Sequence, residues 1–406
     1  MSAADLDETG RTAPHAGSAK AGALKSVWMA PKLAFRNLFH DTISLAVTLT
    51  GIVFSVVLLA VQCGLYLGSE RTIATVLDQV KADLWVMPIG VKSFDDPAIL
   101  GGRERFAVLS QPGVEAASDL FVSFSSWRKP RGGATTVLVV GSDWNHGGFR
   151  PWNIKKGTLD DIAAPNTVIV DEAYFSDLGL DGTDGIGESA EINGNRVTVG
   201  AVSYGIRSFT TLPYIFTTLS RAQAFHDAAP EQASYTLVKV TPGYSVDDVK
   251  KQLAARLPDT EVLGHDEFRK RSLDYWMFQT PAGGGLIAGA LLALIVGIVI
   301  VAQTLYASTK DHLNEFATLR ALGASAGYIH QVILMQAMIS ALVGYAIGMV
   351  ISFIVVWATD GSSLTITMTP ALVFALFIVT IGMCGIAAVS AILKVTRIDP
   401  AGVFSR

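Results

Sequence analysis

Four apolar runs, each long enough to cross a lipid bilayer, constrain this chain more than any other feature of its sequence. They extend over residues 43–67, 285–307, 329–357 and 371–393, and the second contains no charged residue. About 20 apolar residues span the roughly 30 Å hydrocarbon core, and one charge at its centre costs about 2.5–3.5 kcal/mol on insertion scales. The runs therefore predict four transmembrane helices rather than helices buried in a soluble core.

The composition fits a chain that lies partly in the membrane and partly in water. Of its 406 residues, 50% are hydrophobic and 16% are charged, whereas soluble domains carry about 25% charged residues. The formal net charge of −4 gives no support to a nucleic-acid-binding protein. The two cysteines, Cys63 and Cys384, lie inside apolar runs and exclude a disulfide framework and a cysteine-based zinc site. The seven histidines are scattered singly, so no metal site is expected.

The distribution of Lys and Arg predicts the orientation of the spans. Basic residues occur before the first span, in the loop 308–328 and in the tail 394–406, whereas the loop 358–370 contains Asp360 and neither Lys nor Arg. The positive-inside rule therefore places both termini and the loop 308–328 in the cytoplasm. Residues 1–24 are expected to form a disordered cytoplasmic tail. The first apolar run is too long for the core of a signal peptide, so it is expected to remain as a membrane anchor.

The long segment 68–282 then lies outside and has the pattern of a mixed α/β domain. Strand patterns occur at residues 83–87, 135–140, 167–170, 197–202 and 235–240. Asn193-Gly194, between two apolar runs, predicts a hairpin turn. Ser245 predicts the N-cap of a helix that runs to about Leu257, with Asp248 at the position of a capping box.

Helical spacing connects this domain to the spans on both sides. Residues 65–82 continue the first span, and residues 265–279 form a helix that leads back to the membrane. Gly283, Gly284 and Gly285 precede the second span. The free backbone of glycine suits a hinge at this point, although a plain loop is the alternative.

The sequence contains none of the common catalytic signatures. There is no GxxxxGK[ST] phosphate loop, no GxGxxG after a strand, no GxSxG elbow and no HExxH pair. We therefore expect no cofactor on this chain and no ATP hydrolysis by it. The spans also lack Asp, Glu, Lys and Arg, which argues against proton-driven transport and against a channel lined by charged side chains.

Two cytoplasmic segments have amphipathic patterns. Residues 25–41 combine basic residues with an aromatic-rich apolar face, which is typical of an interfacial helix, although ordinary basic flanking of a span is an equal alternative; Trp28, Arg36 and Asn37 lie here. In the loop 308–328, apolar residues follow helical spacing from Asp311 to Leu322, and Gly323 is suited to end that helix. Such a helix either docks into a groove on a partner or packs on its own bundle.

Three motifs resemble one family and favour the docking interpretation. The segment EFATLRALGAS, residues 315–325, resembles the E-(I/F)-A-x-L-R-A-L-G-A-(T/S) segment of FtsX-like ABC transporter permeases of the MacB group. AFRNL, residues 34–38, resembles the A-x-R-N-L that precedes the first span in that family, and DPAGVF, residues 399–404, resembles its closing motif. The layout of four spans with one large insertion also matches. The chain looks most similar to the stand-alone DevC-type permeases.

The resemblance implies a mechanism and a set of partners. It implies a dimer of two copies in the bacterial inner membrane, with a separate ABC ATPase chain that binds ATP and Mg²⁺. The residues carried over as contacts to that ATPase are Glu315, Leu319, Arg320, Leu322 and Gly323. In the DevC and MacB groups a periplasmic adaptor and an outer-membrane duct complete an export pump. Gly344 and Gly348 form a GxxxG match, which suits helix packing within the bundle or a dimer contact.

The cargo and the biological role stay open at this point. Lipids, glycolipids, lipoproteins, peptides and drugs all suit an export pump of this type. The alternative function is that of FtsX-like proteins that regulate a periplasmic enzyme without moving cargo, although the large insertion favours export. A periplasmic enzyme on a membrane anchor is a third hypothesis, for which one span would suffice.

Overall fold

The computed structural model describes residues 42–144, 148–160, 164–180, 185–311, 318, 325–359 and 365–396. The chain forms two compact units. The helical unit comprises Met1–Ala60, Ala290–Phe353 and Thr369–Arg406, and the sheet unit comprises Val61–Gly289 and Ile354–Met368. The predicted tail 1–24 and interfacial segment 25–41 lie outside the described residues.

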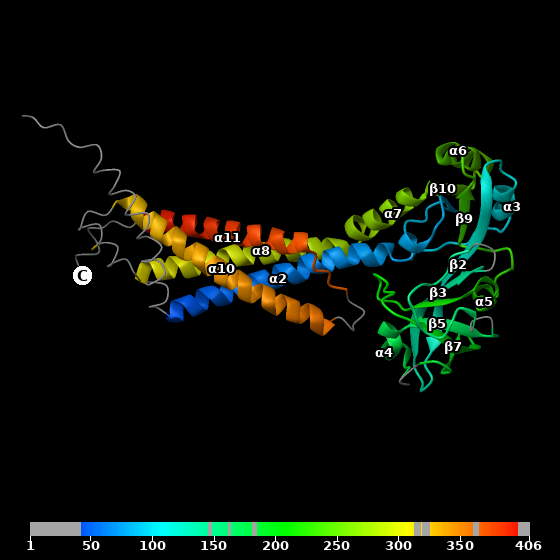
Figure 1. The fold of residues 1–406 in the computed structure, drawn as a ribbon, viewed down its shortest axis with the longest axis horizontal. Helices are drawn as coiled ribbons and strands as arrows, with labels where there is room; N and C mark the ends of the chain where they lie inside the picture. Colours follow the sequence, from blue (N-terminus) through cyan, green and yellow to red (C-terminus); the bar gives the residue numbers. More distant parts are fainter. Residues whose placement is uncertain are drawn as a thin grey trace, which may run out of the picture. The chain divides into compact units, whose positions relative to one another are not determined.

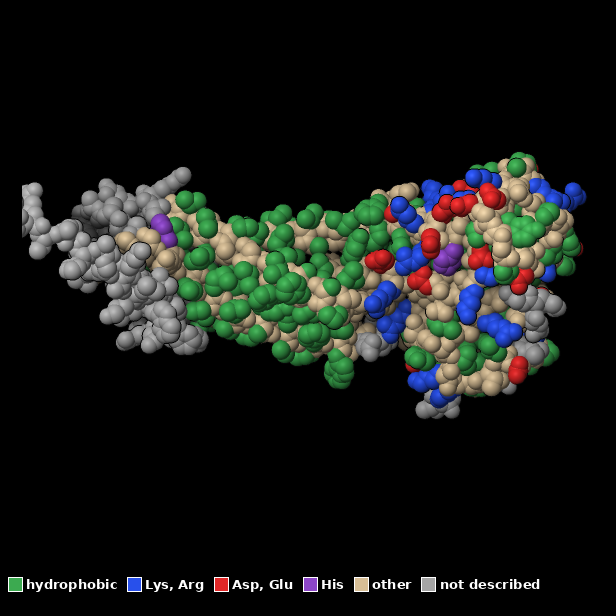
Figure 2. Space-filling view, turned by 45° about the horizontal axis from the view of Figure 1, so that its top comes forward, with side chains coloured by type: hydrophobic (Ala, Val, Ile, Leu, Met, Phe, Trp, Pro, Cys, Tyr) green, Lys and Arg blue, Asp and Glu red, His purple; other side chains and the backbone are tan. Residues whose placement is uncertain are grey.

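Four long apolar helices confirm the four predicted spans. They are α2 (Thr42–Ala74), α8 (Pro281–Asp311), α10 (Ala326–Thr359) and α11 (Pro370–Thr396), drawn as coiled ribbons in Figure 1. Each helix is longer than its predicted apolar run, because backbone hydrogen bonding continues through the flanking polar residues. In α2 the last turn contains Arg71, beyond the apolar run that ends at residue 67. Hydrophobic side chains cover the face of the helical unit seen in Figure 2, as contact with lipid requires.

Glycines let the helices of the helical unit approach closely. A Cβ at Gly344 of α10 would lie 2.5 Å from Ile52 Cγ2 of α2, and one at Gly348 would lie 2.8 Å from Val56 Cγ1. Such distances are shorter than van der Waals contact, so these positions accept only glycine without a shift of α2. Both glycines of the GxxxG match therefore pack against a helix of the same chain.

The sheet unit is built on one ten-stranded sheet. The strand order is β10-β1-β9-β2-β3-β8-β5-β7-β4, with β6 paired to β2 and β7. The pairs β3–β8 and β5–β7 are parallel, and the other pairs are antiparallel. The strands are β1 (Leu84–Pro88), β2 (Val114–Arg128), β3 (Ala134–Ser142), β4 (Ile154–Lys156), β5 (Thr167–Asp171), β6 (Ser189–Ile192), β7 (Asn195–Ser203), β8 (Tyr214–Thr218), β9 (Tyr235–Val240) and β10 (Thr260–Gly264).

Short helices accompany the sheet, and two of them were predicted. Ser245 caps α6 (Val246–Arg256) by accepting a hydrogen bond from the Asp248 N–H at 3.4 Å. The predicted helix 265–279 is α7 (His265–Asp274) followed by the π-helix η4 (Tyr275–Gln279). The others are α3 (Glu104–Leu109), α4 (Phe175–Leu178), α5 (Leu219–Ala224) and the 3₁₀ helices η1 (Leu77–Gln79) and η3 (Glu172–Tyr174).

The five predicted strands are all present, as β1, β3, β5, β7 and β9. The predicted turn joins β6 to β7, with φ of 47° at Asn193 and 87° at Gly194. The prediction missed β2, the longest strand, because Ser123, Ser125 and Ser126 interrupt its apolar pattern. Pairing with β3 holds these serines in the sheet regardless of their own preference.

Aromatic side chains fill the core beside β1 and enclose one carboxyl group. The Trp85 ring lies 5.5 Å from Tyr235 and 5.2 Å from Phe268 between centroids. Asp95, only 4% exposed, accepts a hydrogen bond of 2.6 Å from the Tyr214 hydroxyl. Burial raises the pKa of Asp95 from 3.8 to about 6, because the loss of water disfavours its charged form more than the Tyr214 hydrogen bond favours it.

The connection between α10 and α11 packs on α2 within the sheet unit. The Thr367 N–H donates a 2.9 Å hydrogen bond to the Gly64 carbonyl. A Cβ on Gly64 would lie 2.7 Å from Ile366 Cγ2, and one on Gly68 would overlap the Thr365 carbonyl oxygen. The two glycines therefore leave the space in which residues 365–367 lie.

Replacing Asp95 with Asn should remove a pH-dependent part of the stability of the sheet unit. The folded state keeps the carboxyl proton to higher pH than the unfolded state does. The contribution of Asp95 to the free energy of unfolding is therefore full below pH 3.8 and is lost as the pH rises to about 6. The loss is about 3 kcal/mol. The Tm of the full-length protein, followed by tryptophan fluorescence, should therefore fall more steeply with rising pH in wild type than in Asp95→Asn.

The neighbouring residue provides the control for this prediction. Asp96 is exposed, so Asp96→Asn should keep the pH dependence of wild type. Equal slopes of Tm against pH in wild type and Asp95→Asn would contradict the raised pKa of buried Asp95.

Gly68→Ala should destabilise the packing of residues 365–367 on α2. Its methyl group would overlap a backbone carbonyl that cannot rotate away, and overpacking of this kind costs about 1–3 kcal/mol. Gly284→Ala is the control, because no atom lies within 4 Å of its added Cβ and alanine favours helix by up to about 1 kcal/mol. Thermal unfolding of the two variants should shift Tm in different directions, and an unchanged Tm for Gly68→Ala would refute the contact.

Candidate functional site

The residues predicted to contact an ATPase lie outside the described residues. They are Glu315, Leu319, Arg320, Leu322 and Gly323, and the same holds for Trp28, Arg36 and Asn37 of the interfacial segment. In the loop 308–328 the structure describes α8 up to Asp311, Thr318 in a helix, and the chain again from Ser325. The candidate site within the described residues is therefore a different one, in the sheet unit.

This site is the place where the chain enters and leaves the sheet, and we call it the stalk joint. It consists of η1, α7 and η4 with the adjoining turns of α2 and α8. Strand β1 follows η1, strand β10 precedes α7, and the two strands pair antiparallel with Leu84 opposite Gly264. The His265 N–H donates to the Asp83 carbonyl at 3.2 Å. The two arms of the chain therefore meet at neighbouring strands.

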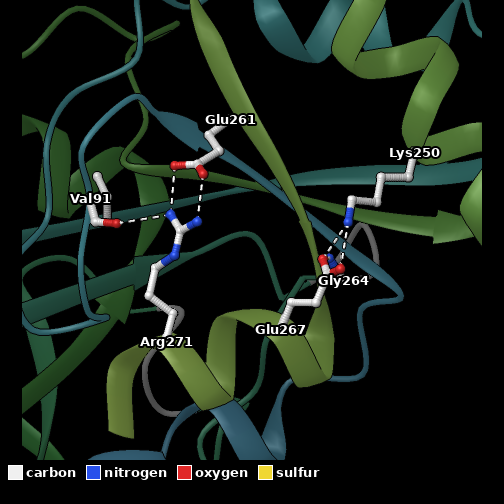
Figure 3. Close-up of polar contacts among 6 residues, drawn as sticks. All are labelled: Val91, Lys250, Glu261, Gly264, Glu267 and Arg271. Carbon is white, nitrogen blue, oxygen red and sulfur yellow. Dashed lines mark hydrogen bonds and ion pairs between the residues drawn. The ribbon is translucent and has the colours of Figure 1, made fainter. Parts of the chain in front are cut away.

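An arginine of α7 fixes that helix to the edge strand of the sheet. Figure 3 shows Arg271 facing Glu261 of β10, with Nη1–Oε2 and Nη2–Oε1 distances of 2.6 Å each. The same Nη1 lies 3.4 Å from the Val91 carbonyl, in the loop after β1. The hydrogen bonds to Glu261 raise the pKa of Arg271. A bidentate pair fixes orientation as well as distance, so α7 cannot rotate on the sheet without breaking it.

A second carboxylate secures the start of α7. Glu267 accepts a 2.8 Å hydrogen bond from the Gly264 N–H and a 2.7 Å bond from Lys250 Nζ of α6 (Figure 3). A carboxylate in the first turn satisfies a free backbone N–H and suits the positive end of the helix dipole. The Lys250 contact, followed by the Gly264 N–H, lowers the pKa of Glu267. Glu267 therefore ties the helix start to α6.

A third ion pair joins the two arms directly. Arg269 Nε of α7 donates to Asp78 Oδ1 of η1 at 2.7 Å, and this hydrogen bond raises the pKa of Arg269. The side chains are 33% and 44% exposed, so the pair contributes at most about 1 kcal/mol to stability. Its importance is positional, because it links the end of the first arm to the start of the second.

The second arm is interrupted between η4 and α8. Thr280 is extended, with φ of −109° and ψ of 152°, and Pro281 begins α8. Proline suits a first helical position because it has no N–H to satisfy. Single π-turns occur frequently at functional sites. The helical path back to the membrane is therefore broken at one residue.

The predicted hinge glycines lie just after this break, inside the first turns of α8. A Cβ on Gly283 would overlap the backbone of Met277, whereas Gly284 and Gly285 have no neighbour within 4 Å of such an atom. Gly283 thus allows the start of α8 to fold back closely on η4. The three glycines are helical here rather than part of a plain loop.

The loop between β7 and β8 also contacts the joint. The Phe209 ring lies 5.1 Å from the Trp276 ring of η4, and Thr211 has a φ of 60°. A cavity of about 250 Å³ lies between this loop and the two arms. Its lining residues are Leu65, Ser69 and Thr72 of α2, Ser208, Phe209 and Thr211 of the loop, Ala282 and Leu286 of α8, and Thr365.

The described residues offer little for catalysis. None of them forms a group of three or more His, Cys, Asp or Glu side chains that could hold a metal ion. His226 contacts Ser123 Oγ at 3.2 Å and Ser125 Oγ at 3.3 Å, and its Nε2 lies 3.0 Å from the Phe124 carbonyl. These contacts hold the end of α5 to β2, and no carboxylate orients the imidazole among the contacts of the described residues, as a triad would need.

The sequence did not predict the ion pairs of the stalk joint. Residues 265–279 were predicted only as a helix that leads back to the membrane, and nothing local identified the partners of its charged residues. Asp78 and Arg269 are 191 residues apart in the chain. The one available signal was that the charges lie on a helix entering a membrane span.

Comparison with known proteins identifies the family of the chain. Residues 45–256 match the family model of the MacB-like periplasmic core domain, and residues 287–400 match that of the FtsX-like permease C-terminal region. An uncharacterised ABC transporter permease of Mycobacterium bovis is 24% identical over 371 residues, which is 89% of this chain and 94% of that protein. Another from Mycobacterium tuberculosis is 23% identical over 368 residues, 87% of this chain and 93% of that protein.

Two solved structures are similar to part of the chain. The periplasmic region of MacB from Actinobacillus actinomycetemcomitans is 13% identical and covers 49% of this chain and 96% of its own, with a TM-score of 0.36. The extracellular domain of the noncanonic ABC-type transporter YknZ from Gram-positive bacteria is 13% identical. It covers 45% of this chain and 99% of its own, with a TM-score of 0.34.

Both family models match this chain, which has four apolar helices and an α/β domain between the first and the second helix. A permease of this kind is generally the non-catalytic membrane subunit of its transporter. The chain belongs to the MacB/FtsX-type family of ABC transporter permeases.

Proposed function

We propose that this chain converts ATP hydrolysis on a separate ATPase chain into movement of its sheet unit outside the cytoplasm. The observation that carries the proposal is the stalk joint. The first arm ends in η1 and the second begins with α7, and Arg269–Asp78 joins them beside the pair β1–β10. A displacement of either arm therefore reaches the same edge of the sheet.

The geometry supports transmission through the arms better than passage of cargo through the spans. Arg271–Glu261 and Glu267–Lys250 make α7 a rigid extension of the sheet. The described parts of the spans contain no Asp, Glu, Lys or Arg between residues 43 and 67 or between 285 and 307, so they offer no charged path for a polar cargo.

At the cytoplasmic end we assign the contact with the ATPase to the loop 308–328. Glu315, Leu319, Arg320, Leu322 and Gly323 would form the coupling helix, with ATP and Mg²⁺ bound on the partner. The interfacial segment with Trp28, Arg36 and Asn37 would lie on the cytoplasmic leaflet. Both termini would be cytoplasmic, in keeping with the basic residues of those segments.

The complete machine that we propose is an export pump. Two copies of this chain would form a homodimer in the inner membrane, and a periplasmic adaptor and an outer-membrane duct would extend it. The cargo would be a lipid, glycolipid, drug or peptide-like molecule taken up outside the cytoplasm. If the chain instead regulates a periplasmic enzyme, its loss should change the activity of that enzyme without accumulation of any cargo.

Arg320→Glu should weaken binding of the ATPase subunit. A reversed charge in the coupling helix leaves an acidic partner group unpaired and repelled, which costs about 2–5 kcal/mol at an interface. Affinity purification of the tagged full-length chain from membranes should recover at least about tenfold less ATPase. Lys394→Glu, on another cytoplasmic segment, is the matched control and should recover the wild-type amount. Full recovery with Arg320→Glu would refute the coupling assignment.

Arg269→Gln should uncouple the sheet unit from ATP without unfolding it. The pair is half-exposed, so the free energy of unfolding should change by less than about 1 kcal/mol. Hydrogen exchange of the amides in β1 and α7, compared with and without ATP in the complex, should lose its ATP dependence.

The charge-swapped variant Asp78→Arg/Arg269→Asp is the control for this second test. It should restore the ATP-dependent change in exchange, because it restores the link between η1 and α7. A full ATP response in Arg269→Gln would show that the joint transmits through other contacts.

A further inference from the structure

We propose that the sheet unit binds an organic anion with an apolar body in a cavity beside the segment that joins η1 to β1. The cavity has a volume of about 350 Å³, within the range of small-molecule sites. Its walls come from residues 79–82, the start of β2, the loop 148–150 and residues 237–239 of β9. The inference goes beyond the proposed function, because binding here requires neither an ATPase nor an export partner.

The charge of the cavity is opposite to that of its surroundings. Lys81, Arg150 and Lys239 come from three separate segments and line it together, and none of its lining residues is Asp or Glu. The whole segment 68–282 contains 21 Lys and Arg against 27 Asp and Glu. Because Asp83 pairs with Lys239, the local positive potential that attracts an anion comes from Lys81 and Arg150.

Two of the three cations have donors left for a ligand. Arg150 donates from Nε and Nη2 to the Trp144 carbonyl at 3.1 and 2.8 Å, which fixes the guanidinium, and its Nη1 donates to no other described residue. Lys81 is exposed and forms no ion pair with another described residue. Lys239 is held by Asp83 Oδ1 at 2.9 Å, which offsets its charge, so the anion would be bound by Lys81 and Arg150.

The floor of the cavity is apolar. Val80, Phe149 and Leu237 line it and belong to the buried hydrophobic cluster of the sheet unit, so only a small part of each side chain faces the cavity. Ser118 also lines the cavity. A ligand that places a carboxylate or phosphate between Lys81 and Arg150 would bury its apolar body against this floor. Inorganic phosphate would contact Lys81 and Arg150 but has no apolar body to place against the floor.

The test uses the full-length chain in nanodiscs of zwitterionic lipid, with calorimetric titration of phenyl phosphate and phenylacetate. Both aromatic anions should bind, and inorganic phosphate should bind at least about tenfold more weakly. The double variant Lys81→Gln/Arg150→Gln should lower the affinity for phenyl phosphate by at least about tenfold, because each charge-assisted hydrogen bond contributes that much or more to binding. Lys251→Gln, an exposed lysine on α6 outside the cavity, should bind as wild type does.

A second variant separates loss of binding from loss of folding. Ala82→Trp fills the cavity without changing its charge and should also abolish binding, while thermal unfolding reports whether each variant is folded. The proposal is overturned if neither aromatic anion binds wild type, if benzylamine binds as tightly as phenyl phosphate, or if the folded double variant keeps wild-type affinity. Equal affinity for inorganic phosphate would overturn the role of the apolar floor.

Discussion

The pairing of β1 with β10 is the interaction on which the rest of the sheet unit depends. The first strand of the domain and the last lie side by side, with Leu84 opposite Gly264, although about 180 residues separate them in the sequence. Because the ladder is antiparallel, the chain enters β1 and leaves β10 at the same end. Everything inserted between them can fold as one body, and the two membrane arms arrive together.

The contacts around α7 follow from this arrangement. A helix that starts at the end of an edge strand has free backbone N–H groups and exposed charges on one side. Glu267 satisfies the Gly264 N–H, and Arg271 returns to Glu261 of the strand that α7 has just left. Arg269 then reaches Asp78 only because β1 has brought η1 alongside. Together, Arg271–Glu261, Glu267–Lys250 and Arg269–Asp78 join β10, α6 and η1 to the same helix.

The sequence predicted those helices and strands whose formation depends on a short stretch of residues alone. The spans follow from a bilayer thickness, and α6 follows from the Ser245 N-cap, so both were found. Strand β2 was missed because the serines in its second half are acceptable only once β3 pairs with them. The ion pairs of the stalk joint and the cationic cavity depend on residues far apart in the chain, and no local sequence pattern predicts such long-range contacts. The predicted coupling residues were recognised from a motif and lie outside the described residues.

The break at Thr280 gives the two arms different mechanical properties. Helix α2 has an unbroken ladder of hydrogen bonds over 33 residues, about 50 Å at 1.5 Å per residue, so it resists torsion along its length. The return path loses that ladder at one extended residue before Pro281, and a single pair of backbone dihedrals absorbs rotation there. In the transmission that we propose, twist would be carried by α2, whereas the return arm would turn about Thr280 and carry push and pull.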